Sequence, residues 1–272
     1  MARPKITSRE YKVLLHAAQF QGDRAALAQS ALAFWQDFRR AIGNIALDTD
    51  GRLAVEERRL IRFHDTSDHC LRRNDYVFRE RIDEATGQRE VTLKFRHPDR
   101  YFAASRDVTP ASSQSARTKF EEDIKAPFHG LYSHSTTQPI GGNKHLNRLK
   151  DPGRLFPGLP KQLDRYDDDE AIAPVGAHTV RELVLTGAHV QISNRPKVEA
   201  ECALIVWYDA AGVRHRPEVV EFSFRYGDDD EGYAGKAARR AYEIFQTLQA
   251  PALADWVDPA GATKTAYAYD HA

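Results

Sequence analysis

Apolar and charged residues alternate along much of this chain, which is the pattern of strands with one buried face. Two segments, 23–43 and 234–249, instead repeat apolar residues every three or four positions and predict helices. In the first, Asp23 can cap the start and Gly43 can end the helix. The alternation predicts strands at about 5–16, 57–65, 76–83 and 89–96, one within "ASSQSARTKFEEDI", and three at about 180–193, 196–208 and 217–226.

The remaining segments show neither the alternation typical of strands nor the apolar repeat typical of helices. Residues 125–177 are rich in Pro, Gly, His and Asp, which predicts a long irregular insertion with a short helix near "HLNRLKD". Residues after 249 are expected to form a loose tail. About eight strands with few helices favour an α+β fold in which one antiparallel sheet curls or closes into a barrel, with the helices packed outside. We expect one domain over 1–272, with a helical insertion at 17–50.

Charged side chains recur at alternate positions on strand after strand, and residues two apart share a face of a strand. Apolar residues such as Phe95 and Phe222 take the opposite positions. A solvated outer face explains any single charged pair, but the repetition favours a closed barrel with an ionic lumen, which would need a charged ligand. The charged set is Glu10 and Lys12; Arg79 and Arg81; Lys94 and Arg96; Arg117, Lys119 and Glu121; Arg195, Lys197, Glu199 and Glu201; Glu221 and Arg225.

The overall composition limits the partners. Lys plus Arg equals Asp plus Glu, at 39 each, which argues against nucleic acid and against an anionic membrane surface as partners. Neither an apolar signal segment nor a run long enough to span a bilayer is evident. With two cysteines far apart, the expectation is a cytoplasmic protein with reduced thiols, although one disulfide is compatible with the sequence.

Several of these segments resemble, in the same order, motifs of the CYTH superfamily, the triphosphate tunnel metalloenzymes. "SREYK" lies where that family has E-x-E-x-K, "VTLKFR" resembles its T-x-K strand, and "ARTKFEED" its R-x-E strand. "SNRPKVEAE" resembles its later arginine strand and "VVEFSFR" its final E-x-E strand. A further signature is matched by Phe63, Asp65, Thr66, Asp68, Leu71, Phe78, Arg79 and Arg81.

The resemblance implies an antiparallel barrel of about eight strands around a tunnel that holds a small-molecule triphosphate and Mg²⁺ or Mn²⁺. Glu10, Lys12 and Glu221 would be catalytic. A metal-held water would attack the terminal phosphorus. The implied metal ligands are Glu10, Glu121, Glu199, Glu201 and Glu221. The implied substrate-binding residues are Lys12, Arg79, Arg81, Lys94, Arg96, Arg117, Lys119, Arg195, Lys197 and Arg225.

Two positions depart from the family pattern. Ser8 stands where the first motif has its leading glutamate, and Ser223 replaces the second glutamate of the last motif. Three functions therefore stay open: metal-dependent hydrolysis of an inorganic or organic triphosphate, binding of a polyphosphate or nucleotide without catalysis, and an adenylyl cyclase of the same superfamily. The first is favoured, and the identity of the organic group is left open.

Overall fold

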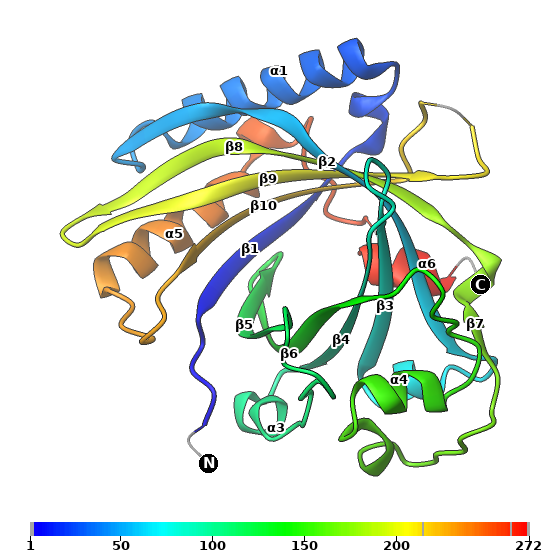
Figure 1. Ribbon diagram of the computed structural model, residues 1–272. Coiled ribbons are helices and arrows are strands. Elements are labelled where there is room, and N and C mark those ends of the chain that lie inside the picture. Colours follow the sequence, from blue (N-terminus) through cyan, green and yellow to red (C-terminus); the bar gives the residue numbers. More distant parts are fainter. Residues whose placement is uncertain (1–2, 214, 262, 271–272) are drawn as a thin grey trace.

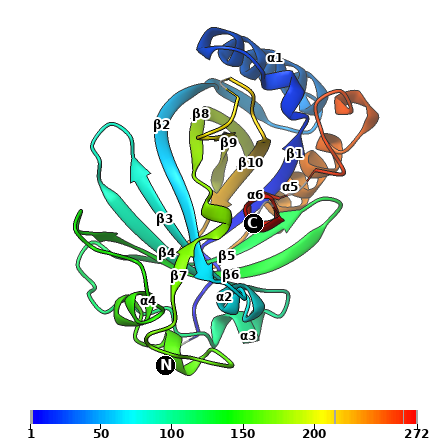
Figure 2. The same cartoon turned by 90° about the vertical axis from the view of Figure 1, so that its right-hand side faces the viewer.

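The computed structural model describes residues 3–213, 215–261 and 263–270, and its strands form a closed ring (Figures 1 and 2). Nine strands make the ring, because β3 pairs with β4 at one side and with β2 at the other. Most neighbours are antiparallel, and β1 runs parallel to β5. In ring order the strands are β3 (Tyr76–Asp83), β4 (Arg89–His97), β6 (His129–Ile140), β5 (Arg117–Lys125), β1 (Ser8–Leu15), β10 (Val219–Gly227), β9 (Lys197–Asp209), β8 (Val180–Asn194) and β2 (Asp48–Thr66). The predicted closed barrel is confirmed.

The outer face of the barrel carries the apolar positions, and helices cover it. α1 (Arg24–Ile42) and α5 (Gly235–Leu248) pack on one side, where Tyr11, Phe222 and Leu204 are buried beneath them. Asp23 caps α1, since its carboxylate accepts from the Ala25 and Ala26 amides at 3.0 Å. A second apolar cluster lies outside β3 and β4. With one face of each strand buried under helices, the other face is left to line the lumen.

Shorter elements connect and close the barrel. The short strand β7 pairs with β2 outside the ring. None of the helices in the described ranges is long and apolar enough to cross a membrane. The short elements are η1 (Ala17–Phe20), α2 (Cys70–Arg73), α3 (Arg100–Ala104), α4 (Lys150–Leu155), η2 (Leu159–Lys161), β7 (Ile172–Pro174), η3 (Val175–Ala177), η4 (Pro251–Leu253) and α6 (Lys264–Asp270).

Two expectations about irregular segments were wrong. Strand β6 lies within 125–177, and it completes the ring between β4 and β5. Its sequence lacks alternation because both of its faces are polar: Ser135 shares a face with Ser133 and Thr137, and the opposite face carries His134 and Thr136. The tail after 249 is also not loose throughout, because η4 and α6 lie in it and Tyr269 is buried.

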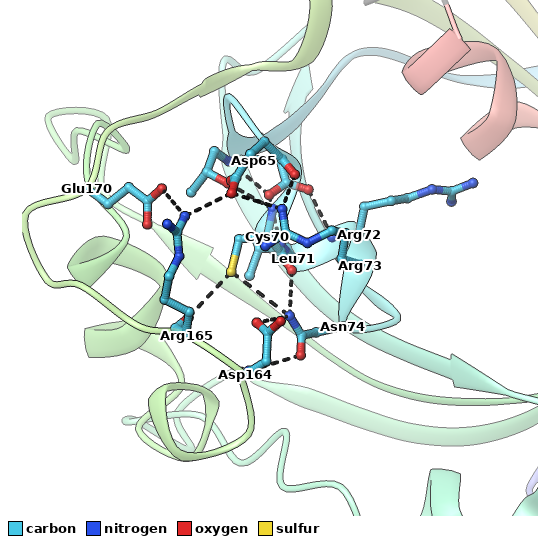
Figure 3. Close-up of polar contacts among 11 residues, drawn as sticks. Asp65, Cys70, Leu71, Arg72, Arg73, Asn74, Asp164, Arg165 and Glu170 are labelled. Carbon is cyan, nitrogen blue, oxygen red and sulfur yellow. Dashed lines mark hydrogen bonds and ion pairs between the residues drawn. The ribbon is translucent and has the colours of Figure 1, made fainter.

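Asp65, the first aspartate of the "DTSD" segment, connects three parts of the fold through hydrogen bonds. The Asp65 carboxylate accepts hydrogen bonds from the backbone amides of Thr66, Leu71 and Arg72, at 2.8 to 3.0 Å (Figure 3). It also accepts from the hydroxyl of Tyr269 in α6 at 2.9 Å. Asp65 therefore ties the end of β2 to α2 and to the C-terminal helix.

Candidate functional site

The lumen contains a cavity of about 100 Å³ whose charged lining residues are nearly all cations. Its walls come from strands that are distant in sequence but adjacent in the ring, and from the segment that begins α6. Among the described residues that line it, six are basic and one is acidic. The basic residues are Lys12, Arg79, Lys94, Arg96, Lys125 and Lys264, and the acidic one is Glu221.

Apolar side chains and α6 close one end of this lumen. Phe63, Trp207 and Val219 lie on the inward positions of β2, β9 and β10, and they pack against Tyr267, Ala268 and Tyr269 of α6. In Figure 2, α6 lies within the outline of the barrel. The tunnel is therefore a pocket with one closed end among the residues that the structure describes.

A buried carboxylate organises the cations on β1 and β4. Asp123 is fully buried, and it lies 2.7 Å from Lys12 Nζ and 3.0 Å from Arg96 Nη2. The Ser133 hydroxyl also donates to it at 2.6 Å. Although burial would raise the pKa of Asp123, Lys12, Lys94 and Arg96 hold it well below its usual range. Asp123 is thus ionised at neutral pH and fixes two of the lumen cations.

Other cations in the cavity have no such partner. The side chains of Arg79, Lys94 and Lys125 make no hydrogen bond or ion pair with another described residue, and Arg79 Nε is buried without a partner. Asp123 attracts Lys94 and Lys125, and Glu182 attracts Arg79, only over a longer range. Burial lowers the pKa of Lys94 and of Lys125 to about 8. Burial also lowers the pKa of Arg79, although a guanidinium stays charged at neutral pH. Removing cations from water is costly when no carboxylate pairs with them directly, so this arrangement favours an anionic ligand.

Toward the opposite end the lumen widens into a cleft of about 770 Å³. There Arg81 and Arg117 both pair with Glu90, at 3.2 and 3.0 Å. Lys119 and Arg225 line a different cavity, where Lys119 lies 3.7 Å from Glu121 and Arg225 lies 2.8 Å from Glu201. These predicted substrate-binding cations are already matched by carboxylates, in contrast to Arg79 and Lys94 deeper in the barrel.

The carboxylates expected to hold a metal are not gathered in one place. No group of three or more His, Cys, Asp or Glu in the described ranges is arranged to hold a metal ion. Glu10 lies 2.8 Å from Lys12, Glu221 lies 2.9 Å from Lys264, and Glu121 accepts from the Ser8 hydroxyl at 2.8 Å. Since Mg²⁺ and Mn²⁺ need several oxygen donors directed at one point, this donor set does not fit such an ion as it stands.

The hairpin between β8 and β9 places some predicted residues away from the cavity. Arg195 is exposed in the turn, and Lys197 pairs with Glu199 at 2.7 Å near the start of β9. The "SNRPKVEAE" segment is therefore a turn followed by a strand. The structure does not bring these three residues together with Arg79.

Several lumen residues were not predicted, among them Asp123, Lys125, Glu182 and Lys264. Asp123 and Lys125 continue the inward positions of β5 beyond Glu121, so strand parity could have identified them. Glu182 on β8 is 2% exposed and accepts from Trp207 Nε1 at 2.9 Å. Lys264 had no signal, because its segment shows no alternation that points to the lumen.

Comparisons with known proteins give low similarity. No family model and no curated protein matches this chain. A candidate adenylyl cyclase from Hippeastrum, HpAC1, described as having a dominant triphosphatase activity, is similar at 12% identity over 97% of this chain and 96% of its own, with a TM-score of 0.47. A candidate adenylate cyclase from Bacillus halodurans is 13% identical over 92% and 95% of the two chains, with a TM-score of 0.37. One from Vibrio parahaemolyticus is 10% identical over 90% and 87%, with a TM-score of 0.32.

Proposed function

We propose that the lumen binds a small molecule carrying a triphosphate. The observation that carries this proposal is the convergence of Arg79, Lys94 and Lys125 on one cavity without a carboxylate that is ion-paired to any of them. Guanidinium and ammonium groups donate charge-assisted hydrogen bonds to phosphate oxygens, each contributing about 1.5 to 3 kcal/mol. A triphosphate carries enough negative charge to balance several such cations at once.

The reaction that we propose is hydrolysis of the bound triphosphate, as the resemblance of the sequence motifs implies. Lys12 and Arg79 would bind phosphate oxygens and offset the charge that develops on the leaving group. Asp123 would keep Lys12 and Arg96 oriented toward the ligand. Glu10, which pairs with Lys12, and Glu221, which pairs with Lys264, are further lumen carboxylates, and either could orient an attacking water.

Binding without hydrolysis is the second candidate, and a specific observation favours it. Glu10, Glu121 and Glu221 each engage a lysine or serine of the chain itself. Ser8 and Ser223, which replace two family glutamates, supply hydroxyls in place of carboxylates. A lumen built in this way retains its anion-binding cations but offers fewer free oxygens for a metal.

A substrate panel separates the two candidates. Inorganic triphosphate, thiamine triphosphate and nucleoside triphosphates would each be incubated with purified protein, with Mg²⁺, with Mn²⁺ and with chelator. For a hydrolase, we expect phosphate release from at least one compound. Calorimetric binding with no phosphate release from any of them would assign the non-catalytic function. The absence of both binding and release would overturn the proposal.

The lowered lysine pKa values predict a pH dependence of binding. Lys94 faces Asp123, Arg96, Glu121 and Lys12, and its pKa of about 8 means that it loses its proton as pH rises through that value. The affinity for triphosphate should therefore fall between pH 7 and 9.5, because the charged form makes the contact. Lys94→Arg keeps the charge and should flatten this profile. Equal slopes for the variant and the natural protein would contradict the assignment of Lys94.

The same pKa predicts the opposite trend for stability without ligand. Between about pH 8 and the ordinary lysine value near 10.4, the unfolded chain binds more protons at Lys94 than the folded protein does. The free energy of unfolding that is linked to this group therefore rises with pH in that window. Below about pH 8 the lysine is protonated in both states, and the cost of burying its charge is fully present.

A further inference from the structure

The segment that begins α6 contributes directly to the cationic cavity. Thr263, Lys264 and Thr265 line it together with residues of the barrel strands. Lys264 Nζ lies 2.9 Å from Glu221 Oε1, and the two side chains are 20% and 9% exposed. The Lys264 ammonium also lies 5.9 Å from the centre of the Trp207 ring. A lysine from the C-terminal segment therefore neutralises a lumen carboxylate that the sequence motifs assign to a metal.

The position of Lys264 is well fixed by its surroundings. Tyr267 and Tyr269 are buried among inward side chains of the barrel. The hydroxyl of Tyr269 donates to the buried Asp65, and the guanidinium of Arg72 lies 4.9 Å from the Tyr269 ring centre. Because α6 is anchored by these tyrosines about one turn beyond Lys264, the fold itself holds this lysine at the cavity.

We propose that Lys264 takes the place of a divalent cation at Glu221, so that triphosphate binding in this tunnel does not require a metal. This inference rests on the proposed function of the cavity. An ammonium has three donors, and the ion pair with Glu221 uses one, which leaves the others for phosphate oxygens. A divalent ion that binds Glu221 Oε1 would compete with Lys264 for that oxygen, and one that binds the other oxygen would be repelled by the nearby ammonium.

Replacement of Lys264 by methionine tests this inference, because methionine keeps an unbranched side chain and removes the charge. Affinity for inorganic triphosphate would be measured by calorimetry in chelator and again in Mg²⁺. We expect the natural protein to bind in chelator, and Lys264→Met to bind at least about tenfold more weakly there, which corresponds to the loss of one charged contact. Adding Mg²⁺ should raise the affinity of Lys264→Met more than it raises the affinity of the natural protein, because in the variant Glu221 is free to bind the metal. Lys236→Met, at an exposed position of α5, should match the natural protein in both buffers.

The outcomes separate this inference from the proposed function. Thermal melts of each variant first establish that it is folded. If the natural protein binds triphosphate only when a divalent metal is present, or if Lys264→Met binds as tightly as the natural protein in chelator, the inference is overturned while the proposed function stands. If the natural protein binds triphosphate under neither condition, the proposed function fails as well.

Discussion

Arg79→Met should weaken triphosphate binding by about 100-fold or more, because a guanidinium can make two charged hydrogen bonds to phosphate, each of about 1.5 to 3 kcal/mol. Arg79 lies in the cavity wall with its Nε buried and unpaired within the described residues, so it has unused donors for a ligand. Calorimetric titration with inorganic triphosphate measures the change. The remaining affinity should also depend less on salt, since one fewer charge takes part.

The fold should tolerate this change, and that separates a binding role from a structural one. Arg79 is half-buried and has no ion-paired carboxylate. Removing its charge relieves a desolvation cost and loses only a longer-range attraction to Glu182, so the free energy of unfolding without ligand should change little. Arg239→Met is a matched control: its side chain is 81% exposed on α5, where it pairs with Glu243. Unchanged affinity in Arg79→Met, or an equal loss in the control, would remove Arg79 from the site.

Asp123→Ala should destabilise the protein by about 3 to 5 kcal/mol, which is the usual cost of removing one partner from a buried ion pair. The carboxylate is fully buried and is shared by Lys12, Arg96 and the Ser133 hydroxyl. Without it, neighbouring cations in the lumen lose their shared counter-charge. Urea unfolding at neutral pH measures this loss. Glu243→Gln, which breaks an exposed pair on α5, should change stability by less than about 1 kcal/mol.

A bound polyanion should partly restore the Asp123→Ala variant. Triphosphate supplies the negative charge that the variant lacks, and a ligand that binds the folded state alone stabilises it according to its concentration and affinity. The gain in stability on adding triphosphate should therefore be larger for Asp123→Ala than for the natural protein. An equal or smaller gain would mean that the lumen cations near Asp123 do not contact the ligand.

The alternation of residues along a strand correctly predicted which side chains face the lumen wherever the other face of that strand is apolar. On β3, Phe78 is buried outside the barrel while Arg79 lines the cavity, as the alternation of the sequence indicates. The pattern did not identify β6, because both of its faces are polar. It misplaced Arg195 as well, because this residue lies between the two strands, in the turn from β8 to β9, where the alternation of faces along a strand does not apply.

Contacts between distant segments were the part of the site that the sequence did not reveal. Nothing local links Lys264 to Glu221 or Tyr269 to Asp65, since these pairs meet only after the barrel has closed around α6. The sequence likewise suggested a set of metal-binding glutamates, but Lys12 of the same strand contacts Glu10, and Ser8 of the neighbouring strand donates to Glu121. Residue type and parity predicted the charge of the lumen, and tertiary pairing determined which charges are available to a ligand.

The most direct measurement is a crystal structure of the protein with inorganic triphosphate, grown in chelator. We predict that its phosphate oxygens contact Arg79, Lys94 and Lys264 in the enclosed cavity, with the barrel strands unchanged. Triphosphate bound outside the lumen, or a cavity that stays empty in crystals soaked at saturating concentration both in chelator and in Mg²⁺, would contradict the claim that this tunnel is a triphosphate site.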